Sequence, residues 1–298
     1  MESGNRMFKK LKNTVIYYSV RALIGLIGFC PAFMVRFLGV FLGAGAFCIA
    51  RSERALSIKH LKQSFKNISN RHSQIITRGV FNQLGISIVE LCRIMRNPES
   101  APAVSIDKDS LDILNETLAL NKGAVFITGH IGNWELMAIE LAKRGVSIYT
   151  VAKPSYDSRF TDFIKKKRVS LGVNPIYRDD KGTTAAMLRA LKKGALLGFL
   201  IDQDTKVKSV FVDFFNRPAF TPSGAASFAI ATKTPVLAGS IKRLSNMSHL
   251  ITIEKITLPA SELEATKELT LKLEQRIRGQ VTQWVWFHRR WKTKQFKL

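Results

Sequence analysis

Acidic residues and cysteines are both scarce in this sequence, and each shortage excludes some classes of protein. Asp and Glu total 22 against 46 Lys and Arg, so the formal net charge is +24. The three cysteines, Cys30, Cys48 and Cys92, are an odd number without metal-ligand spacing. This argues against a disulfide framework or a structural zinc site and favours a reducing compartment. The sequence also lacks a glycine-rich nucleotide loop and a metal-ligand motif, so it implies no cofactor.

The excess of positive charge predicts a polyanionic partner. Three kinds of partner fit this charge: nucleic acid, an anionic membrane, and an acidic protein or phosphorylated substrate. The chain has 298 residues, of which 46% are hydrophobic, so it is long and apolar enough to fold around a sizeable core.

A strongly apolar segment, Val15–Ala50, lies near the N-terminus and is interrupted by charge only at Arg21 and Arg36. Its uncharged runs, Ala22–Val35 and Phe37–Ala50, are each shorter than the ~20 residues that cross a bilayer as one helix. The two alternatives to membrane attachment are a secretory signal peptide and a buried helical hairpin with a basic rim.

The charges around this segment favour a membrane. Residues 1–72 contain twelve Lys and Arg residues, among them Lys9, Lys10 and Lys12, against two Glu, which leaves a net charge of +10. Cations that flank an apolar helix attract an anionic leaflet. We therefore expect residues 1–50 to anchor the protein, either as an in-plane helix or as a membrane-spanning helix over Val15–Val35 with a kink at Pro31.

The rest of the chain, residues 51–298, is predicted to form one catalytic domain. A helical pattern over Ser52–Arg96 is followed by a loop to Val104 and then by alternating short apolar runs and helical segments. This order predicts an α/β fold with a central, mostly parallel sheet flanked by helices. The expected strands are Val125–Thr128, Ser147–Ala152, Val173–Tyr177, Ala195–Ile201, Val236–Ile241 and Leu250–Glu254, and a long helix over Ser261–Trp284 closes the chain.

His130 and Glu135 form the pair of residues that best indicates acid–base chemistry. His130 directly follows the strand Val125–Thr128 between two glycines, and Glu135 comes five residues later, in the first turn of the next helix. The chain can fold the two together, so that the carboxylate orients the imidazole and the other ring nitrogen accepts a proton. No serine or cysteine nucleophile lies nearby, so the pair suits deprotonation of a substrate hydroxyl. On spacing alone, a capping histidine and a surface acid fit equally well.

Five blocks of sequence, in order, resemble the lipid A biosynthesis (lauroyl/myristoyl) acyltransferase family, within the broader glycerolipid acyltransferase group. These blocks are Arg51–Arg54 with Ile58–Phe65, Thr128–Glu135, Lys192–Asp204, Phe211–Thr221 and Trp284–Lys292. Two departures are Lys59-His60, where Arg-Asn is usual, and Asn216 in place of a loop glycine.

The resemblance implies transfer of an acyl group from acyl carrier protein to a hydroxyl of a phosphorylated lipid A precursor, on the cytoplasmic face of the cell inner membrane. It implies that His130 is the general base and that Glu135 orients it. Arg168 would stabilise the thioester oxyanion or hold a phosphate, unless it merely belongs to a solvated basic face. Asp202 would position Arg168 or the acceptor hydroxyl, or form a structural hydrogen bond. His288 and the neighbouring tryptophans are expected to be structural.

Other functions remain open on the sequence. The same residues would serve an enzyme that acylates another glycolipid, such as a phosphatidylinositol mannoside or an ornithine or polyene lipid, with acyl-CoA as donor. A basic nucleic-acid-binding protein is disfavoured because the cations flank an apolar segment and not an aromatic basic groove. An inactive membrane scaffold is disfavoured by the intact His130 and Glu135.

Overall fold

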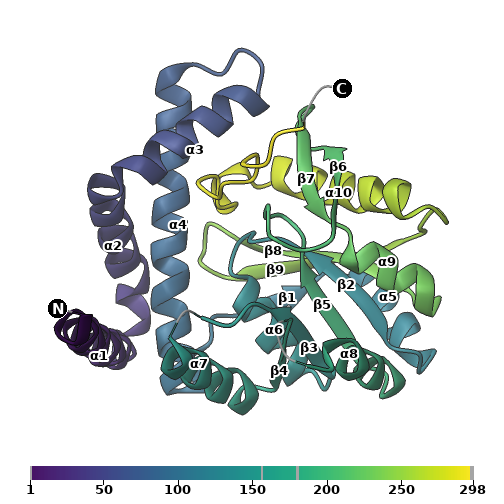
Figure 1. Ribbon diagram of the computed structural model, residues 1–298, viewed down its shortest axis with the longest axis horizontal. Helices are drawn as coiled ribbons and strands as arrows, with labels where there is room; N and C mark the ends of the chain where they lie inside the picture. The colour runs from purple at the N-terminus through teal and green to yellow at the C-terminus, as the bar shows by residue number, and fades with distance from the viewer. Residues whose placement is uncertain (1, 156, 179–180, 296–298) are drawn as a thin grey trace.

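The computed structural model describes residues 2–155, 157–178 and 181–295, and the central element is a seven-stranded sheet in the order β1-β9-β8-β2-β5-β3-β4 (Figure 1). All neighbouring strands are parallel except β8 and β9, which are antiparallel. The strands are β1 (Val104–Ile106), β2 (Ala124–Thr128), β3 (Ile148–Ala152), β4 (Val173–Tyr177), β5 (Leu196–Leu200), β8 (Val236–Arg243) and β9 (His249–Ile256). The predicted α/β class is confirmed.

Helices cover both faces of this sheet, which is why its central strands are apolar on both sides. In β2, Val125 and Ile127 pack into one core cluster, whereas Ala124 and Phe126 pack into a second cluster on the opposite face. The covering helices are α5 (Lys108–Ala119), α6 (Trp134–Lys143), α7 (Ser158–Ser170), α8 (Thr183–Lys192), α9 (Gly224–Thr232) and α10 (Glu262–Arg278).

The helical pattern predicted over Ser52–Arg96 forms two helices, α3 (Arg51–Ser64) and α4 (Asn70–Arg96). The break falls where Phe65 leaves the helical conformation and Ser69 accepts a hydrogen bond from the His72 amide as the N-cap of α4. In Figure 1, α4 lies between the sheet and the N-terminal helices. Helix α4 therefore links the N-terminal helices to the part of the chain that carries the sheet.

The N-terminal region contains two helices, α1 (Glu2–Ile27) and α2 (Val35–Ile49), joined by a short 3-10 turn at Ala32–Met34. A single helix over Val15–Val35 with a kink at Pro31 does not form. Instead, α1 ends before Pro31, whose ring removes a backbone donor and disfavours helix at the residue before it. Among the described residues, two segments are long and apolar enough to cross a membrane by composition, Ala32–Ile49 and Asn70–Arg96.

Two segments at the edge of the sheet where the parallel strands end differ from the prediction. The closing helix ends at Arg278, and after a 3-10 turn (Val281–Gln283) the chain returns toward the sheet. The expected loop Phe211–Thr221 lies within a hairpin of β6 (Ser209–Asp213) and β7 (Pro218–Pro222). Both segments cover the edge where β2 and β5 end, and this edge carries the site.

Candidate active site

His130 lies in the loop between β2 and α6, at the carboxyl edge of the parallel sheet, where active sites of such folds gather. Backbone contacts fix this loop. Gly132 has a φ of +63°, and a Cβ there would lie 2.0 Å from the Ile241 carbonyl oxygen, so only glycine fits. The Gly132 amide donates to the Gln283 carbonyl at 2.7 Å, and Ile131 forms a bridge with Trp284.

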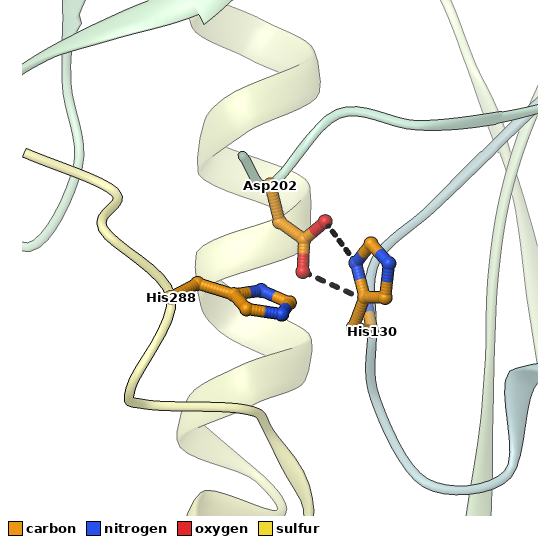
Figure 2. Close-up of side chains that lie close together, drawn as sticks. All are labelled: His130, Asp202 and His288. Carbon is orange, nitrogen blue, oxygen red and sulfur yellow. Dashed lines mark hydrogen bonds and ion pairs between the residues drawn. The ribbon is translucent and has the colours of Figure 1, made fainter. Parts of the chain in front are cut away.

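The carboxylate that contacts His130 belongs to Asp202, which follows β5 (Figure 2). His130 donates from Nδ1 to Oδ1 at 2.8 Å and from its backbone amide to Oδ2 at 2.7 Å. Trp284 also donates to Oδ2, from Nε1 at 2.8 Å. Burial of Asp202 would raise its pKa, but the neighbouring His130 and its hydrogen bonds outweigh burial and hold the pKa well below the usual range. Asp202 is therefore a stable anion.

The expected contact between His130 and Glu135 is not among the hydrogen bonds of the described residues. Glu135 instead accepts two hydrogen bonds from Arg168, one from Nε to Oε2 at 3.0 Å and one from Nη2 to Oε1. The reason is local: α6 begins at Trp134, and its first turn directs Glu135 toward α7, which carries Arg168. Burial of Arg168 would lower its pKa, but the Glu135 carboxylate outweighs burial and raises it. The predicted residues thus form two pairs, His130 with Asp202 and Glu135 with Arg168.

Two residues that were not predicted to take part also contact His130. The His288 ring stands perpendicular to the His130 ring, with centroids 4.7 Å apart. The Gln203 side-chain nitrogen lies 3.3 Å from His130 Nε2 and 3.2 Å from His288 Nε2. Burial lowers the pKa of His288 to about 4, so this histidine is neutral near pH 7. The only signal in the sequence was their presence in motif blocks, Gln203 directly after Asp202 and His288 two residues after Trp286.

His130, Asp202 and His288 each offer one donor atom within 4.8 Å of the others, a spacing that could in principle hold a metal ion. However, the two carboxylate oxygens of Asp202 already accept three hydrogen bonds. The arrangement therefore favours acid–base chemistry: Asp202 holds the proton on Nδ1 of His130. This leaves Nε2, which points away from the carboxylate in Figure 2 and contacts Gln203, as the ring nitrogen that accepts a proton.

A cavity of about 770 Å³ opens beside His130, Glu135 and Arg168. On one face of the sheet it is lined by apolar side chains, and we call this part the apolar lobe: Phe126, Met137, Leu141, Ile148, Leu196 and Gly198. At the carboxyl edge of the sheet the cavity continues toward the β6–β7 hairpin and α9, where Gln203, Lys208 and Ala225 line it. The site thus combines an apolar compartment with a polar opening.

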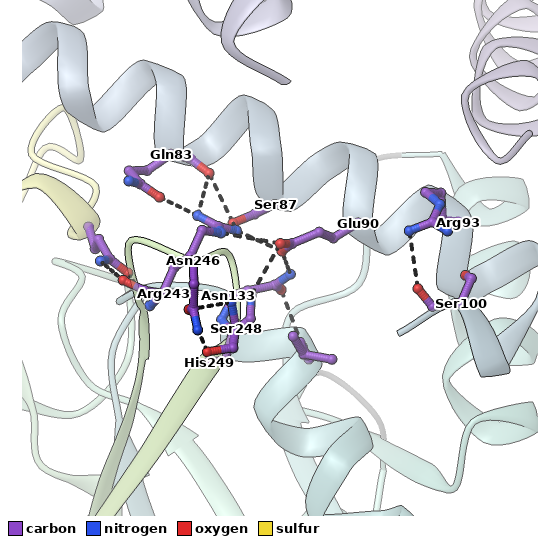
Figure 3. Close-up of polar contacts among 12 residues, drawn as sticks. Gln83, Ser87, Glu90, Arg93, Ser100, Asn133, Arg243, Asn246, Ser248 and His249 are labelled. Atoms are coloured by element: carbon purple, nitrogen blue, oxygen red, sulfur yellow. Dashed lines mark hydrogen bonds and ion pairs between the residues drawn. The ribbon is translucent and has the colours of Figure 1, made fainter. Parts of the chain in front are cut away.

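A buried polar cluster supports the loop from behind (Figure 3). Asn133 caps α6 by accepting from the Leu136 amide, and its side-chain nitrogen donates to Glu90 of α4 at 2.9 Å. Arg243 and His249 also donate to Glu90, at 2.6 and 3.1 Å for the closest atoms. Burial would raise the pKa of Glu90, but His249 and Arg243 outweigh burial and lower it to about 2. An ionised Glu90 thus holds the start of α6.

Comparison with known proteins adds independent information. Residues 2–293 match the family described as bacterial lipid A biosynthesis acyltransferase. The chain is 25% identical over 267 residues to the lipid A biosynthesis palmitoleoyltransferase of Escherichia coli K12, covering 87% of this chain and 85% of that protein. Identity and coverage are the same for the lipid A biosynthesis acyltransferase of Shigella flexneri. This chain is also 32% identical over 133 residues to a phosphatidylinositol mannoside acyltransferase of Mycobacterium tuberculosis, covering 43% of this chain and 41% of that protein.

Proposed function

This chain belongs to the bacterial lipid A biosynthesis acyltransferase family and is an acyltransferase, and from that premise we propose that it moves a fatty acyl group from acyl carrier protein to a hydroxyl of a phosphorylated lipid A precursor. One observation carries the chemical part of the proposal. His130 lines the cavity, and its Nδ1 is held by the buried Asp202 anion, so Nε2 is the acceptor. This is the arrangement of a general base.

In the proposed reaction, His130 Nε2 takes the proton of the acceptor hydroxyl as its oxygen attacks the thioester carbonyl carbon. The carbon–sulfur bond breaks, an ester forms, and the imidazolium returns the proton to the leaving thiolate. Asp202 stabilises the imidazolium while it exists. Arg168 is held by Glu135 at the cavity wall, and in the proposed reaction it stabilises the oxyanion or binds an acceptor phosphate.

The apolar lobe is the proposed site of the acyl chain. It follows one face of β3 and β5 from their carboxyl ends to Ile148 and Leu196, about 13 Å along five residues. Its floor is made of Leu141, Ile148 and Leu196, and each methylene buried there contributes about 0.8 kcal/mol. The lobe thus supports an alkyl chain as the transferred group.

The charge of the protein supports anionic partners. Acyl carrier protein is acidic, a lipid A precursor carries phosphates, and the cytoplasmic leaflet of the inner membrane is anionic, which suits a net charge of +24. We propose that residues 1–50 attach the protein to that leaflet and that residues 51–298 form the catalytic domain.

The decisive experiment offers the purified protein, in detergent micelles, two donors and two acceptors. The donors are acyl-acyl carrier protein and acyl-CoA, and the acceptors are a lipid A precursor and a phosphatidylinositol mannoside. We expect ester formation on the lipid A precursor from the carrier protein, abolished in His130→Ala and kept in a control variant of the exposed His72, His72→Ala. Transfer only to the mannoside would refute the proposed acceptor and would follow the second group of relatives.

A further inference from the structure

Helix α2 packs on α4 with their backbones in contact through three glycines. A Cβ at Gly39 would lie 2.4 Å from the Ile86 Cα, and one at Gly43 would lie 2.5 Å from the Phe81 carbonyl oxygen. On α4, a Cβ at Gly85 would lie 2.2 Å from the Gly39 carbonyl oxygen. Glycines four residues apart allow this close approach. The contact fixes α2 against α4, which belongs to residues 51–298 and packs against the 3-10 turn Val281–Gln283.

The opposite side of α2 and the turn before it expose large aromatic side chains. Phe33, Phe37 and Phe41, spaced at four-residue intervals, are 84%, 70% and 67% exposed. At the end of α1, Leu26 and Phe29 are also exposed. Soluble monomers rarely expose a continuous apolar surface of this kind, which marks an interaction site.

Helix α1 runs in a different direction and is also held by the catalytic domain. In Figure 1 it is seen nearly end-on, whereas α2 lies in the plane of the view and runs alongside α4. Arg159 of α7 donates from Nη1 to the Thr14 hydroxyl at 2.9 Å, and the Phe160 ring contacts the Tyr17 ring at 5.1 Å. Two helices in different directions cannot both cross a bilayer as a parallel pair, but both can lie in one surface plane.

The charges near this apolar surface identify the partner as an anionic lipid surface. Arg36 on α2 and Arg51 at the start of α3 are exposed. A cation near an anionic leaflet contributes attraction that salt weakens. The side chains of residues 2–12 lie outside the described part of the chain, so the contribution of Lys9, Lys10 and Lys12 stays a prediction.

We propose that α1 and α2 lie in the plane of an anionic bilayer surface and do not cross it. The glycine contact with α4 keeps α2 parallel to the surface, and the stripe of Phe33, Phe37 and Phe41 enters the lipid. The apolar segment Ala32–Ile49 has the length and composition of a membrane span, but its α-helical part, Val35–Ile49, has 15 residues and is about 22 Å long, less than a hydrocarbon core of ~30 Å. This inference rests on the membrane attachment in the proposed function and specifies its mode.

The in-plane arrangement has a consequence for substrate entry. Helix α7, which α1 contacts, also forms part of the cavity wall through Thr161, Ile164 and Arg168. A surface plane through α1 therefore brings that wall close to the leaflet. A lipid acceptor can then reach the site without leaving the membrane surface completely.

Spin-label depth on full-length protein tests the arrangement. A nitroxide is attached to Phe37→Cys, Phe41→Cys or Gly45→Cys in a background with alanine at the three native cysteines. The probe is a vesicle of phosphatidylethanolamine and phosphatidylglycerol. We expect Phe37→Cys and Phe41→Cys to read the same shallow depth and Gly45→Cys to match them within a few ångströms. A label at the exposed Lys193, after α8, should stay in water.

A depth that changes steadily by about 6 Å per four residues would overturn the proposal, because that is the rise of a helix crossing the bilayer. Labels that all remain in water would overturn it as well, since α2 would then not touch lipid. Neither result depends on acyl transfer, so failure here is distinguishable from failure of the proposed reaction.

A matched glycine pair tests whether α4 holds α2. Gly43→Ala places its Cβ against the Phe81 carbonyl, whereas Gly45→Ala has nothing within 4 Å. We expect Gly43→Ala to lower Tm and to disturb the depth profile, and Gly45→Ala to keep both or to raise Tm slightly through helix propensity. Equal effects of the two variants would remove the glycine contact as the element that orients α2.

Discussion

Replacement of Asp202 by asparagine should remove the base while preserving the shape of the site. Two N–H donors, the His130 amide and Trp284 Nε1, converge on Oδ2 at 2.7 and 2.8 Å. The carbonyl oxygen of an asparagine must stay at that position, because turning the amide would leave both donors facing an NH₂ group. Each unsatisfied buried donor costs about 1–3 kcal/mol. The NH₂ group then occupies the place of Oδ1.

That orientation changes the tautomer of the histidine. An NH₂ group at 2.8 Å from His130 Nδ1 donates to it, so the ring proton moves to Nε2. A protonated Nε2 cannot accept the proton of the acceptor hydroxyl. We expect kcat to fall by about 10²–10⁴-fold, the contribution of a general base, with little change in Tm.

The assay follows ester product by mass spectrometry at saturating donor and acceptor, with Tm measured on the same samples. Asp204→Asn is the control, because Asp204 accepts hydrogen bonds from Thr293 and not from His130. A kcat for Asp202→Asn within tenfold of the wild type would refute the assignment of Asp202 as the partner of the base.

Three further predictions follow from the same structure. Arg168→Lys should lose most activity even at low salt, because lysine cannot form the paired hydrogen bonds to Glu135; unchanged kcat and KM at two ionic strengths would remove Arg168 from the site. Gly198→Val should shift the preferred acyl chain to a shorter length in a competition among donors, because the valine side chain fills part of the apolar lobe. The substitution fits the fold, since a Cβ at Gly198 meets only ordinary contacts at 3.5 Å. An unchanged preference would mean that the acyl chain binds elsewhere. Burial lowers the pKa of His60 and His288 to about 4, so between about pH 6.5 and pH 4 the unfolded chain binds more protons than the folded chain. The free energy of unfolding should therefore fall with falling pH over this window. A Tm that does not change with pH here, or a His60→Gln variant whose Tm falls as steeply as that of the wild type, would contradict this linkage.

Much of the fold was predictable because its signals are local. The apolar runs bounded by glycine or proline became β2, β3, β4 and β5 almost at the expected bounds, since buried parallel strands must be apolar on both faces. The hairpin of β6 and β7 was read as a loop, and its pairing depends on contacts between strands and on the cover from α10, which a local pattern does not contain.

The site was only partly predictable, and the reason is distance along the chain. His130 and Asp202 are 72 residues apart, and Trp284 lies 82 residues beyond Asp202, so no spacing rule connects them. Glu135 is the acid nearest to His130 in sequence, and its assignment to His130 rested on this spacing and on the family resemblance of Thr128–Glu135. The direction of the first turn of α6 instead gives it to Arg168. The catalytic roles of all four residues stay predictions until variants are assayed.

The hydrogen bond from Trp284 to Asp202 also sets an order for events during synthesis. A ribosome delivers the apolar helices α1 and α2 first and Trp284 only after every strand of the sheet. Until Trp284 arrives, Asp202 lacks one of its three donors, and Ile131 lacks its bridge partner in the loop of His130. A nascent chain can therefore meet the membrane while its catalytic pair is still incomplete. Chemistry on the lipid begins only when the last part of the fold closes over the sheet.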